Sequence, residues 1–600
     1  MRWTATDGSL DVRTLRRAYE NLDLTPESLI DVLYERIARD QHPHAFTHLI
    51  SQEEARAKAR ALGSFAEARH LPLFGVPFGV KDNIDVAGMP TTAACPGFSY
   101  LPAASAPSVI ALEQAGAICL GKTNLDQFAT GLVGSRSPYG TCRNVFDPAY
   151  LSGGSSSGSG VAVAAGYVSL ALGTDTAGSG RVPAALNNIV GLKATRGLLS
   201  TQGVVPACQS LDCVSVFSLS VADAVLAREL IVGKSAQAAD EHGAFGHGFR
   251  FGVPEKLEWY GDKESEALFA RAVETLVSLG GRPVSVDFSP FRELGDLLYG
   301  PWVIERYLSV GAFIEARPES ALPVTREIIL GAKRFDGADV FRAHYERDRL
   351  REACMQELAK VELIVTPTVP THYRLSDDQA DPRAINDRLG IYTRYANFLD
   401  VPVLAVPAGF RPDGLPFGLS LVGHPGRDNQ LDALGAAVHA LSECGMGLSR
   451  SPAPAHTFGQ SVATSEVRLA VVGAHLRGLP LHHQLTECGA RFVRSARTTD
   501  QYRLYVLPGS APVKPGLVRV SSGGHAIELE LYDLSWAALG RFMANVRAPL
   551  AIGNVRTESG EDVKCFLVEP YAVEGAEDIS ALGGFRAYLE TLRAGEASGA

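Results

Sequence analysis

The sequence predicts a layered α/β protein with a largely buried sheet, followed by a small β-rich domain. Two observations support this prediction. Apolar runs of strand length alternate with helical patterns up to about residue 450. A segment rich in Pro, Ser, Ala and Thr (448–466) then breaks the pattern, and short alternating runs follow it. We therefore expect a large domain over 1–450, a linker over 451–465 and a second domain over 466–600.

The large domain contains five clear strand candidates, each an apolar run that ends in a turn or polar signal. They cover 73–81, 117–123, 168–174, 362–367 and 401–408. Helical patterns lie between them, most clearly at 106–116 and 263–280. The N-terminal segment predicts an amphipathic helix, because it lacks the apolar core of a signal peptide. In the second domain, alternating runs predict strands at 467–476, 503–509 and 525–532.

Composition excludes several classes of function. The formal net charge is −10, which argues against a nucleic-acid-binding surface. No uncharged run of about 18 apolar residues predicts a membrane span. The nine cysteines are widely spaced and form no CxxC pair, which indicates reduced thiols in a cytoplasmic protein rather than a disulfide frame or a zinc site.

Two short motifs match known functional patterns but lie in the wrong context. Residues 116–123, "GAICLGKT", fit the phosphate-loop spacing, yet their apolar interior predicts a strand with Lys122 near its end. Residues 154–158, "GSSSG", fit a nucleophile elbow centred on Ser156. The segment before them contains Asp147 and Pro148 and is poor material for the central strand that an elbow requires.

A loop between a strand and a helix offers a better nucleophile. Ser179 lies in this loop, and the next helix is expected to start near Val182 and Pro183. Four backbone N–H groups of the loop would be free of a strand ladder and suited to an oxyanion hole, those of Thr176, Ala177, Gly178 and Ser179.

A base for this serine is available at the end of an apolar strand. Lys81 ends the run 73–81, where partial desolvation would lower its pKa and let the neutral amine accept a proton. The distance to Ser179 could be bridged by a relay hydroxyl from the Ser/Gly tract "SGGSSSGSG" at 152–160. That tract has the composition of a linker, but apolar, core-like sequence follows it.

Three segments, at 75–95, 151–166 and 170–197, closely resemble the amidase signature family of serine hydrolases. The resemblance covers about residues 25–440 and implies a mixed sheet flanked by helices. It also implies a catalytic triad with Ser179 as nucleophile, Lys81 as base and Ser155, preceded by a cis peptide bond, as the bridge between them. On this interpretation the Ser/Gly tract is a buried catalytic loop.

Further features resemble the branch of the family that hydrolyses allophanate. They are Ser157, Ala177 and Gly180 at positions where the family usually has other residues, the segment 121–141, and the appended domain. The resemblance implies that Tyr299 and Arg306 contact the substrate carboxylate, because a guanidinium fork suits a planar carboxylate. Arg136 is the alternative cation and Gly131 a further substrate-binding residue. No metal and no cofactor is implied.

The second domain opens on a strand that leads directly to His475 and resembles a gamma-glutamylcyclotransferase-like fold. By resemblance, His475 promotes decarboxylation of the first domain's product, N-carboxycarbamate; a purely structural or dimerisation role is the alternative. His482 and His483 would point to opposite sides of an extended segment, so we expect no zinc pair there.

The resemblance also implies a homodimer and a functional link to a separate urea carboxylase or biuret hydrolase. Three alternative functions remain open. One is another amidase acting on a small anionic amide such as malonamate, one is the amidase component of an aminoacyl-tRNA amidotransferase, and one is a non-catalytic scaffold. Intact Lys81, Ser155 and Ser179 argue against the scaffold.

Overall fold

A mixed sheet of eleven strands organises the first part of the computed structural model. The structure describes residues 8–39, 42, 44–233, 245, 248–455, 466–509, 512–544 and 546–597. Their contacts separate two units, Met1–Gly459 and Gln460–Ala600. Most of the expected linker, 456–465, lies outside the described residues.

The strands of the first unit follow the order β1-β3-β2-β4-β6-β5-β10-β11-β9-β7-β8 across the sheet. Neighbours pair in parallel around β2 and around β7, and antiparallel elsewhere, so the predicted mixed sheet is confirmed. The strands are β1 (Phe46–Leu49), β2 (Pro77–Lys81), β3 (Ile118–Thr123), β4 (Leu170–Asp175), β5 (Val190–Lys193), β6 (Cys213–Ser218), β7 (Arg250–Pro254), β8 (Arg282–Val286), β9 (Leu363–Pro367), β10 (Val403–Phe410) and β11 (Pro416–Val422).

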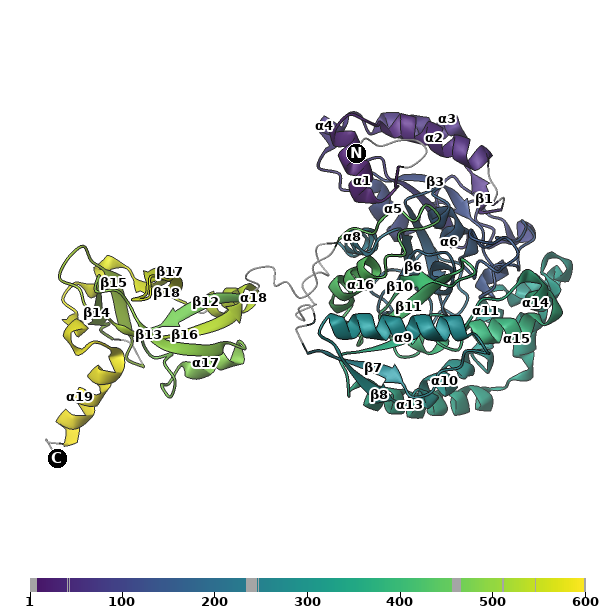
Figure 1. Ribbon diagram of the computed structural model, residues 1–600. Helices are drawn as coiled ribbons and strands as arrows, with labels where there is room; N and C mark the ends of the chain where they lie inside the picture. Colours follow the sequence, from purple (N-terminus) through teal and green to yellow (C-terminus); the bar gives the residue numbers. More distant parts are fainter. Residues whose placement is uncertain are drawn as a thin grey trace. The chain divides into compact units, whose positions relative to one another are not determined.

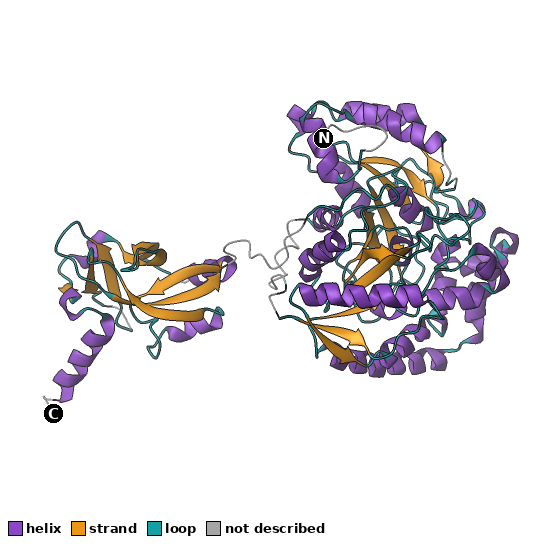
Figure 2. Cartoon of the chain, viewed as in Figure 1, coloured by secondary structure: helices purple, strands orange, loops and turns teal. Residues whose placement is uncertain are grey.

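Helices cover both faces of this sheet (Figure 2). Helices α1 to α4 gather beside β1 and β3, and α10 and α13 lie beside β7 and β8 (Figure 1). The helices are α1 (Val12–Glu20), α2 (Pro26–Ala38), α3 (Gln52–Ala61), α4 (Phe65–Ala68), α5 (Pro107–Gln114), α6 (Ser157–Ala164), α7 (Val182–Leu186), α8 (Val221–Val232), α9 (Lys263–Ser278), α10 (Ser289–Asp296), α11 (Val303–Ala316), α12 (Pro323–Leu330), α13 (Gly337–Leu358), α14 (Leu375–Ala380), α15 (Pro382–Leu389) and α16 (Gln430–Leu441).

All five strands expected in this unit are present, as β2, β3, β4, β9 and β10, and the two expected helices are α5 and α9. The single N-terminal helix is wrong: two helices form, because a capping box between Thr25 and Ser28 starts α2 afresh. Sequence patterns missed β1, β5, β6, β7, β8 and β11. Some of these are only four residues long, and β8 has mostly exposed or half-buried residues, so neither gives a clear apolar period.

The Ser/Gly tract is packed inside this unit. All its residues, 152–160, are buried, and α6 begins within it. A Cβ added at Gly158 would lie 2.3 Å from the carbonyl oxygen of Ala45 and 2.4 Å from the amide nitrogen of Asn124. The small residues therefore permit close approach of backbone segments, which a flexible linker does not require.

The second unit is an α+β domain with two smaller sheets. One has the order β13-β16-β12-β18-β17 and the other β15-β14-β19. The strands are β12 (Glu466–Val471), β13 (Arg491–Arg497), β14 (Tyr502–Val506), β15 (Pro515–Arg519), β16 (Glu528–Ser535), β17 (Leu550–Arg556), β18 (Asp562–Val568) and β19 (Glu577–Asp578), with helices α17 (His482–Glu487), α18 (Trp536–Met543) and α19 (Phe585–Ala597). The three expected strands are β12, β14 and β16.

The segment that contains His482 and His483 is not extended as predicted, because the two residues open α17. Among the described residues, no group of three His, Cys, Asp or Glu side chains is arranged to hold a metal ion. None of the helices in the described ranges is long and apolar enough to cross a bilayer.

The packing of the Ser/Gly tract gives a stability prediction. Gly158→Ala should lower the unfolding free energy by about 1–3 kcal/mol, because the new methyl group meets fixed backbone atoms. Gly337→Ala is the matched control, since a Cβ there meets nothing within 4 Å and should change stability by less than ~0.5 kcal/mol. Thermal and urea unfolding of both variants measures the difference. Equal stability of the two variants would contradict the packing described here.

Candidate active site

The C-terminal ends of two parallel strands bring the candidate residues together. Strand β2 ends at Lys81, and its neighbour β4 ends at Asp175, just before the loop that carries Ser179. Pairing of Phe78 with Leu170 fixes the register of the two strands. Because parallel strands end at the same edge of a sheet, Lys81 and the Ser179 loop share one edge.

Lys81 is fully buried and makes two side-chain hydrogen bonds. Its Nζ donates to Ser155 Oγ and to Thr174 Oγ1, both at 2.8 Å. Burial lowers the pKa of Lys81 to about 7, against the opposing effect of Asp126 and other buried carboxylates. A large fraction of the amine is therefore neutral at neutral pH and able to accept a proton.

Ser155 is held in place by the segment that follows β3. The Gly154–Ser155 peptide bond is cis, as the family resemblance implies. The Ser155 carbonyl accepts a 3.0 Å hydrogen bond from the amide of Asp126. The Asp126 carboxylate in turn accepts from the backbone amides of Val133, Gly134 and Arg136 at 3.0–3.1 Å. One aspartate thus shapes the loop that supports the bridging serine.

The Ser179 loop is shaped by a second aspartate. The Asp175 carboxylate accepts hydrogen bonds from the amides of Gly178 and Gly180 at 2.9 and 3.0 Å. It also makes a bidentate pair with Arg181, with both N–O distances 2.8 Å. Burial by itself would raise the pKa of Asp175, but the charge of Arg181 outweighs it and the pKa is lowered. The aspartate is therefore ionised and holds the loop from within.

Three of the four expected oxyanion-hole donors are free. Within the described ranges, the amides of Thr176, Ala177 and Ser179 have no hydrogen-bond acceptor. The amide of Gly178 is bonded to Asp175, so we assign it to loop shape instead. Ser179 Oγ, in a residue only 3 % exposed, also makes no hydrogen bond to any described group. The loop can therefore offer one hydroxyl and three N–H groups to a substrate.

Arg306 lies in α11 and is 4 % exposed. Its Nη1 donates to Thr130 Oγ1 at 3.0 Å and to the Ala129 carbonyl at 3.2 Å. Its charge contributes to lowering the pKa of Lys81, which places the guanidinium within electrostatic reach of the candidate base. Nε and Nη2 have no partner among the described residues and remain available to an anion.

Tyr299 and Arg136 line a cavity of about 260 Å³, and Arg306 is not among its lining residues. The Tyr299 hydroxyl accepts a 2.8 Å hydrogen bond from Asn386, and Arg136 Nη1 and Nη2 donate to the carbonyls of Thr130 and Pro382. Arg136 Nε is buried without a partner. The expected fork of Tyr299 with Arg306 is therefore not seen, because the two side chains bind different groups.

Gly131 follows Thr130, whose hydroxyl and carbonyl bind Arg306 and Arg136 respectively. A Cβ on Gly131 would lie 2.6 Å from Asp126 Oδ2 and 3.2 Å from Arg136 Cδ. Its described contacts thus explain the need for glycine by packing.

The two competing motifs have structural roles. Lys122 lies within β3, as the sequence indicated, and its Nζ is 3.0 Å from Asp82 Oδ1 in a fully buried ion pair. Ser156 is the N-cap of α6, and its hydroxyl donates to the Thr174 carbonyl at 3.1 Å. Neither residue presents a free group to a ligand.

Sequence reasoning missed four polar residues of the site. Asp175 and Arg181 lie inside the motif around Ser179, so their charge pair could have been found there. Thr174 gave no signal as a partner of Lys81. Asp212 is distant in sequence, yet its carboxylate accepts a 2.5 Å hydrogen bond from Thr176 Oγ1. Only the fold brings it to the loop.

The second unit contains a cavity of about 670 Å³ beside His475. Its charged lining residues are Lys514 and Arg547, and none of its described lining residues is acidic. His475 Nε2 lies 3.0 Å from Gln484 Oε1, and the ring stacks on Phe566 with centroids 5.3 Å apart. Burial lowers the pKa of His475. The cavity is therefore electropositive and suited to an anion.

Comparison with known proteins agrees with this site. Residues 28–431 match the protein family described as Amidase, and the chain belongs to that family. It is accordingly an amidohydrolase. Residues 467–590 match the family described as Allophanate hydrolase C-terminal domain, so the second unit is a domain of this type.

Two kinds of relative cover nearly the whole chain. It is 44 % identical over 575 residues to the urea amidolyase of Saccharomyces cerevisiae, a match that covers 92 % of this chain and 31 % of the relative. The chain thus spans about a third of the length of that curated relative. It also resembles the solved allophanate hydrolase of Kluyveromyces lactis, with a TM-score of 0.73, 40 % identity and coverage of 96 % and 99 % of the two chains.

A more distant relative covers the first unit. It belongs to the glutamyl-tRNA(Gln) amidotransferase of an Exiguobacterium strain and is 32 % identical over 443 residues, which are 67 % of this chain and 91 % of the relative.

The burial of Lys81 gives a prediction for pH dependence. The neutral amine is the active form, so kcat/KM should rise with pH through about 7 and level off above it. Lys81→Ala should lower kcat/KM by about 10²–10⁴-fold and remove this rise. Adding Ser179→Ala should cost little more, because members of a catalytic unit are not additive. Ammonia release between pH 5 and 9 measures both effects, and a Lys81→Ala variant with the wild-type profile would overturn the assignment.

Proposed function

We propose that the first unit hydrolyses allophanate to N-carboxycarbamate and ammonia through an acyl-enzyme on Ser179. The observation that carries this proposal is the 2.8 Å bond between buried Lys81 and Ser155, at the sheet edge that also presents Ser179. A lysine with a pKa near 7 next to a relay hydroxyl is suited to activate a serine. Similarity to an allophanate hydrolase over both units supports the choice of substrate.

In the proposed mechanism Ser179 Oγ attacks the terminal amide carbon of allophanate. Its proton passes to Ser155, whose own proton passes to neutral Lys81. The amides of Thr176, Ala177 and Ser179 stabilise the tetrahedral oxyanion. When the C–N bond breaks, protonated Lys81 returns a proton through Ser155 to the departing ammonia. Water then attacks the acyl ester by the same route in reverse and releases N-carboxycarbamate and the serine.

The substrate is an anion and requires a cation near the nucleophile. We propose Arg306 as the principal contact of the carboxylate, because its charge acts on Lys81 and two of its nitrogens have no partner among the described residues. Tyr299, Gly131 and Arg136 remain proposed substrate-binding residues. Arg136 is the alternative cation, supported by its unpartnered Nε in the cavity that Tyr299 also lines.

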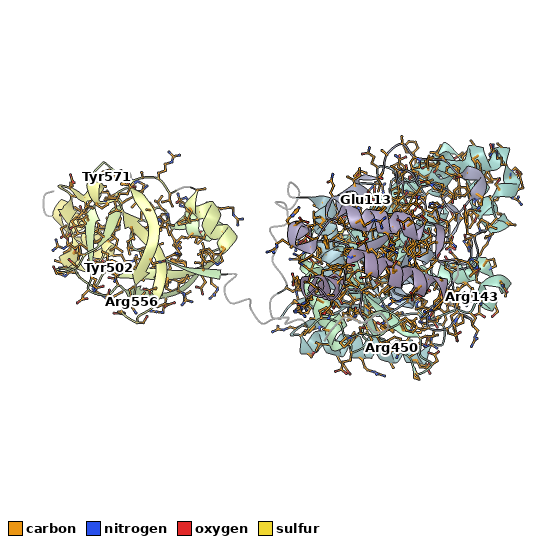
Figure 3. All side chains as sticks on the ribbon, turned by 90° about the horizontal axis from the view of Figure 1, so that it is seen from above. Glu113, Arg143, Arg450, Tyr502, Arg556 and Tyr571 are labelled. Carbon is orange, nitrogen blue, oxygen red and sulfur yellow. The ribbon has the colours of Figure 1, made fainter. Side chains whose placement is uncertain are left out.

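We further propose that the second unit decarboxylates N-carboxycarbamate. This step breaks one C–N bond, releases carbon dioxide and places a proton on nitrogen, leaving carbamate, which decomposes to ammonia and carbon dioxide. The electropositive cavity with Lys514 and Arg547 supports binding of a dianion, and His475 lines it in a position to move the proton. Tyr571, labelled in Figure 3, also lines the cavity and adds a phenol donor.

The biological setting remains a proposal. Similarity to urea amidolyases over about a third of their length supports a functional link to a urea carboxylase, with biuret hydrolase as another source of the substrate. A homodimer and a cytoplasmic location remain predictions. Hydrolysis of another small anionic amide, such as malonamate, is the alternative activity.

A substrate panel tests the proposed activity. Purified protein should release ammonia from allophanate with a kcat/KM far above those for malonamate, glutamine and an uncharged amide. Arg306→Ala should raise KM for allophanate roughly 10-fold or more and leave the uncharged amide unchanged, because it removes one charge-assisted hydrogen-bonding partner worth about 1.5–3 kcal/mol. Arg136→Ala is the matched comparison.

The outcomes of this panel are distinct. A selective effect of Arg136→Ala instead of Arg306→Ala would move the carboxylate site to the cavity with Tyr299. Preference for malonamate or glutamine would replace the proposed substrate.

The second unit has a separate test. His475→Ala should leave release of the first ammonia unchanged but slow release of carbon dioxide, so that N-carboxycarbamate accumulates. Arg547→Ala should act in the same direction, because its guanidinium lines the cavity. Carbon-13 NMR of labelled allophanate follows both products. Prompt decarboxylation in both variants would assign the unit a structural role.

A further inference from the structure

Asp212 lies immediately before β6 and is 6 % exposed. Its carboxylate accepts hydrogen bonds from Thr176 Oγ1 at 2.5 Å, from the amide of Ala207 at 2.9 Å and from the amide of Cys208 at 3.1 Å. Thr176 is the first residue of the oxyanion loop. The carboxylate therefore clamps the loop before β6 to the loop that carries the proposed oxyanion donors.

The loop before β6 is also tied to the helix that carries Arg306. The amide of Ser210 donates to Glu305 Oε2 at 2.7 Å, and the Ser210 hydroxyl bonds the other oxygen of Glu305. Glu305 directly precedes Arg306 in α11. The charge of Arg306 contributes to stabilising ionised Asp212, which links the two residues through space as well. One short loop thus contacts both the proposed carboxylate site and the oxyanion loop.

A second, independent tie keeps this loop in place. Asn397 Nδ2 donates to the carbonyl of Leu211 at 2.9 Å and to the carbonyl of Asp175 at 2.8 Å. Arg181 Nη2 donates to Asn397 Oδ1 at 3.2 Å. The loop before β6 therefore remains attached to the nucleophile loop when Asp212 is altered. What Asp212 adds is the hold on the Thr176 side chain.

We infer that Asp212 is a positioning residue that orients the oxyanion loop through the Thr176 hydroxyl and couples this orientation to the seat of Arg306. The inference rests on the proposed hydrolase function of the same site. Thr176 carries one of the three free N–H groups, so rotation of its peptide would redirect a donor away from the developing oxyanion. Donors of this kind act only in the correct geometry, and a shift of about 1 Å costs on the order of 100-fold in rate.

The test compares two variants that break the clamp with one that keeps it. Asp212→Asn keeps size but removes the charge and places an amide N–H group near the donors, and Thr176→Val removes the hydroxyl. Thr176→Ser keeps the hydroxyl and is the matched control. For each variant, kcat and KM are measured with allophanate and with an uncharged amide. Inhibition is measured with an alkylboronic acid, which forms a tetrahedral serine adduct, and with malonate, which resembles the ground state.

We expect Asp212→Asn and Thr176→Val to lower kcat by roughly 10–100-fold on both substrates, with KM changed less than about twofold. Binding of the boronic acid should weaken by a similar factor, and binding of malonate should not change. Thr176→Ser should behave as wild type. The double variant should be no worse than the weaker single variant, because both changes break one interaction.

Other results would overturn the inference. A Thr176→Val variant with wild-type kcat and boronic acid affinity would show that the clamp does not orient the donors. Equal losses of kcat, malonate affinity and thermal stability would show a general structural role. Should the wild type prefer another amide to allophanate, the proposed substrate fails, and the same comparison on the preferred amide still decides the role of Asp212.

Discussion

Removal of the Lys81 amine from water is the constraint on which the rest of the candidate site depends. A fully buried ammonium is costly, and the cost appears as a pKa near 7 in place of the usual 10.5. The sheet supplies the apolar surroundings, since β2 lies between β3 and β4 and all its residues are buried. Ser155 and Thr174 satisfy the amine with neutral oxygens, which keeps its charge optional. A carboxylate in direct contact would fix the lysine as a cation and remove its use as a base.

Three aspartates solve a different problem, the shape of loops that have no regular hydrogen bonding of their own. Asp126 binds the amides of the segment that supports Ser155, Asp175 binds amides of the Ser179 loop, and Asp212 binds amides of the loop before β6. Each carboxylate replaces the partners that a helix or strand would provide. Their negative charges also favour the protonated lysine, so burial of the amine must outweigh them. The site therefore balances loop order against basicity.

The two units use charge in different ways. In the first, the cations near the nucleophile are individually tied to carbonyl groups, as Arg306 is to Ala129 and Arg136 to Thr130. Such ties fix a guanidinium and leave selected nitrogens for a ligand. In the second, Lys514 and Arg547 line a larger cavity without an acidic residue among its described walls. An amide anion requires orientation for attack, whereas loss of carbon dioxide chiefly requires that an anion be held and a proton supplied.

The sequence by itself determined the strand-and-helix alternation, the change of texture near residue 450 and the motifs around Lys81, Ser155 and Ser179. These are local properties: apolar runs, glycine where backbones approach closely, and short polar loops at strand ends. Only the tertiary structure decided which groups meet. It committed the Gly178 amide to Asp175, gave Tyr299 and Arg306 different partners, and brought Asp212 to Thr176. The physical reason is that a hydrogen bond between residues distant in sequence depends on strand order and register, which no local pattern encodes.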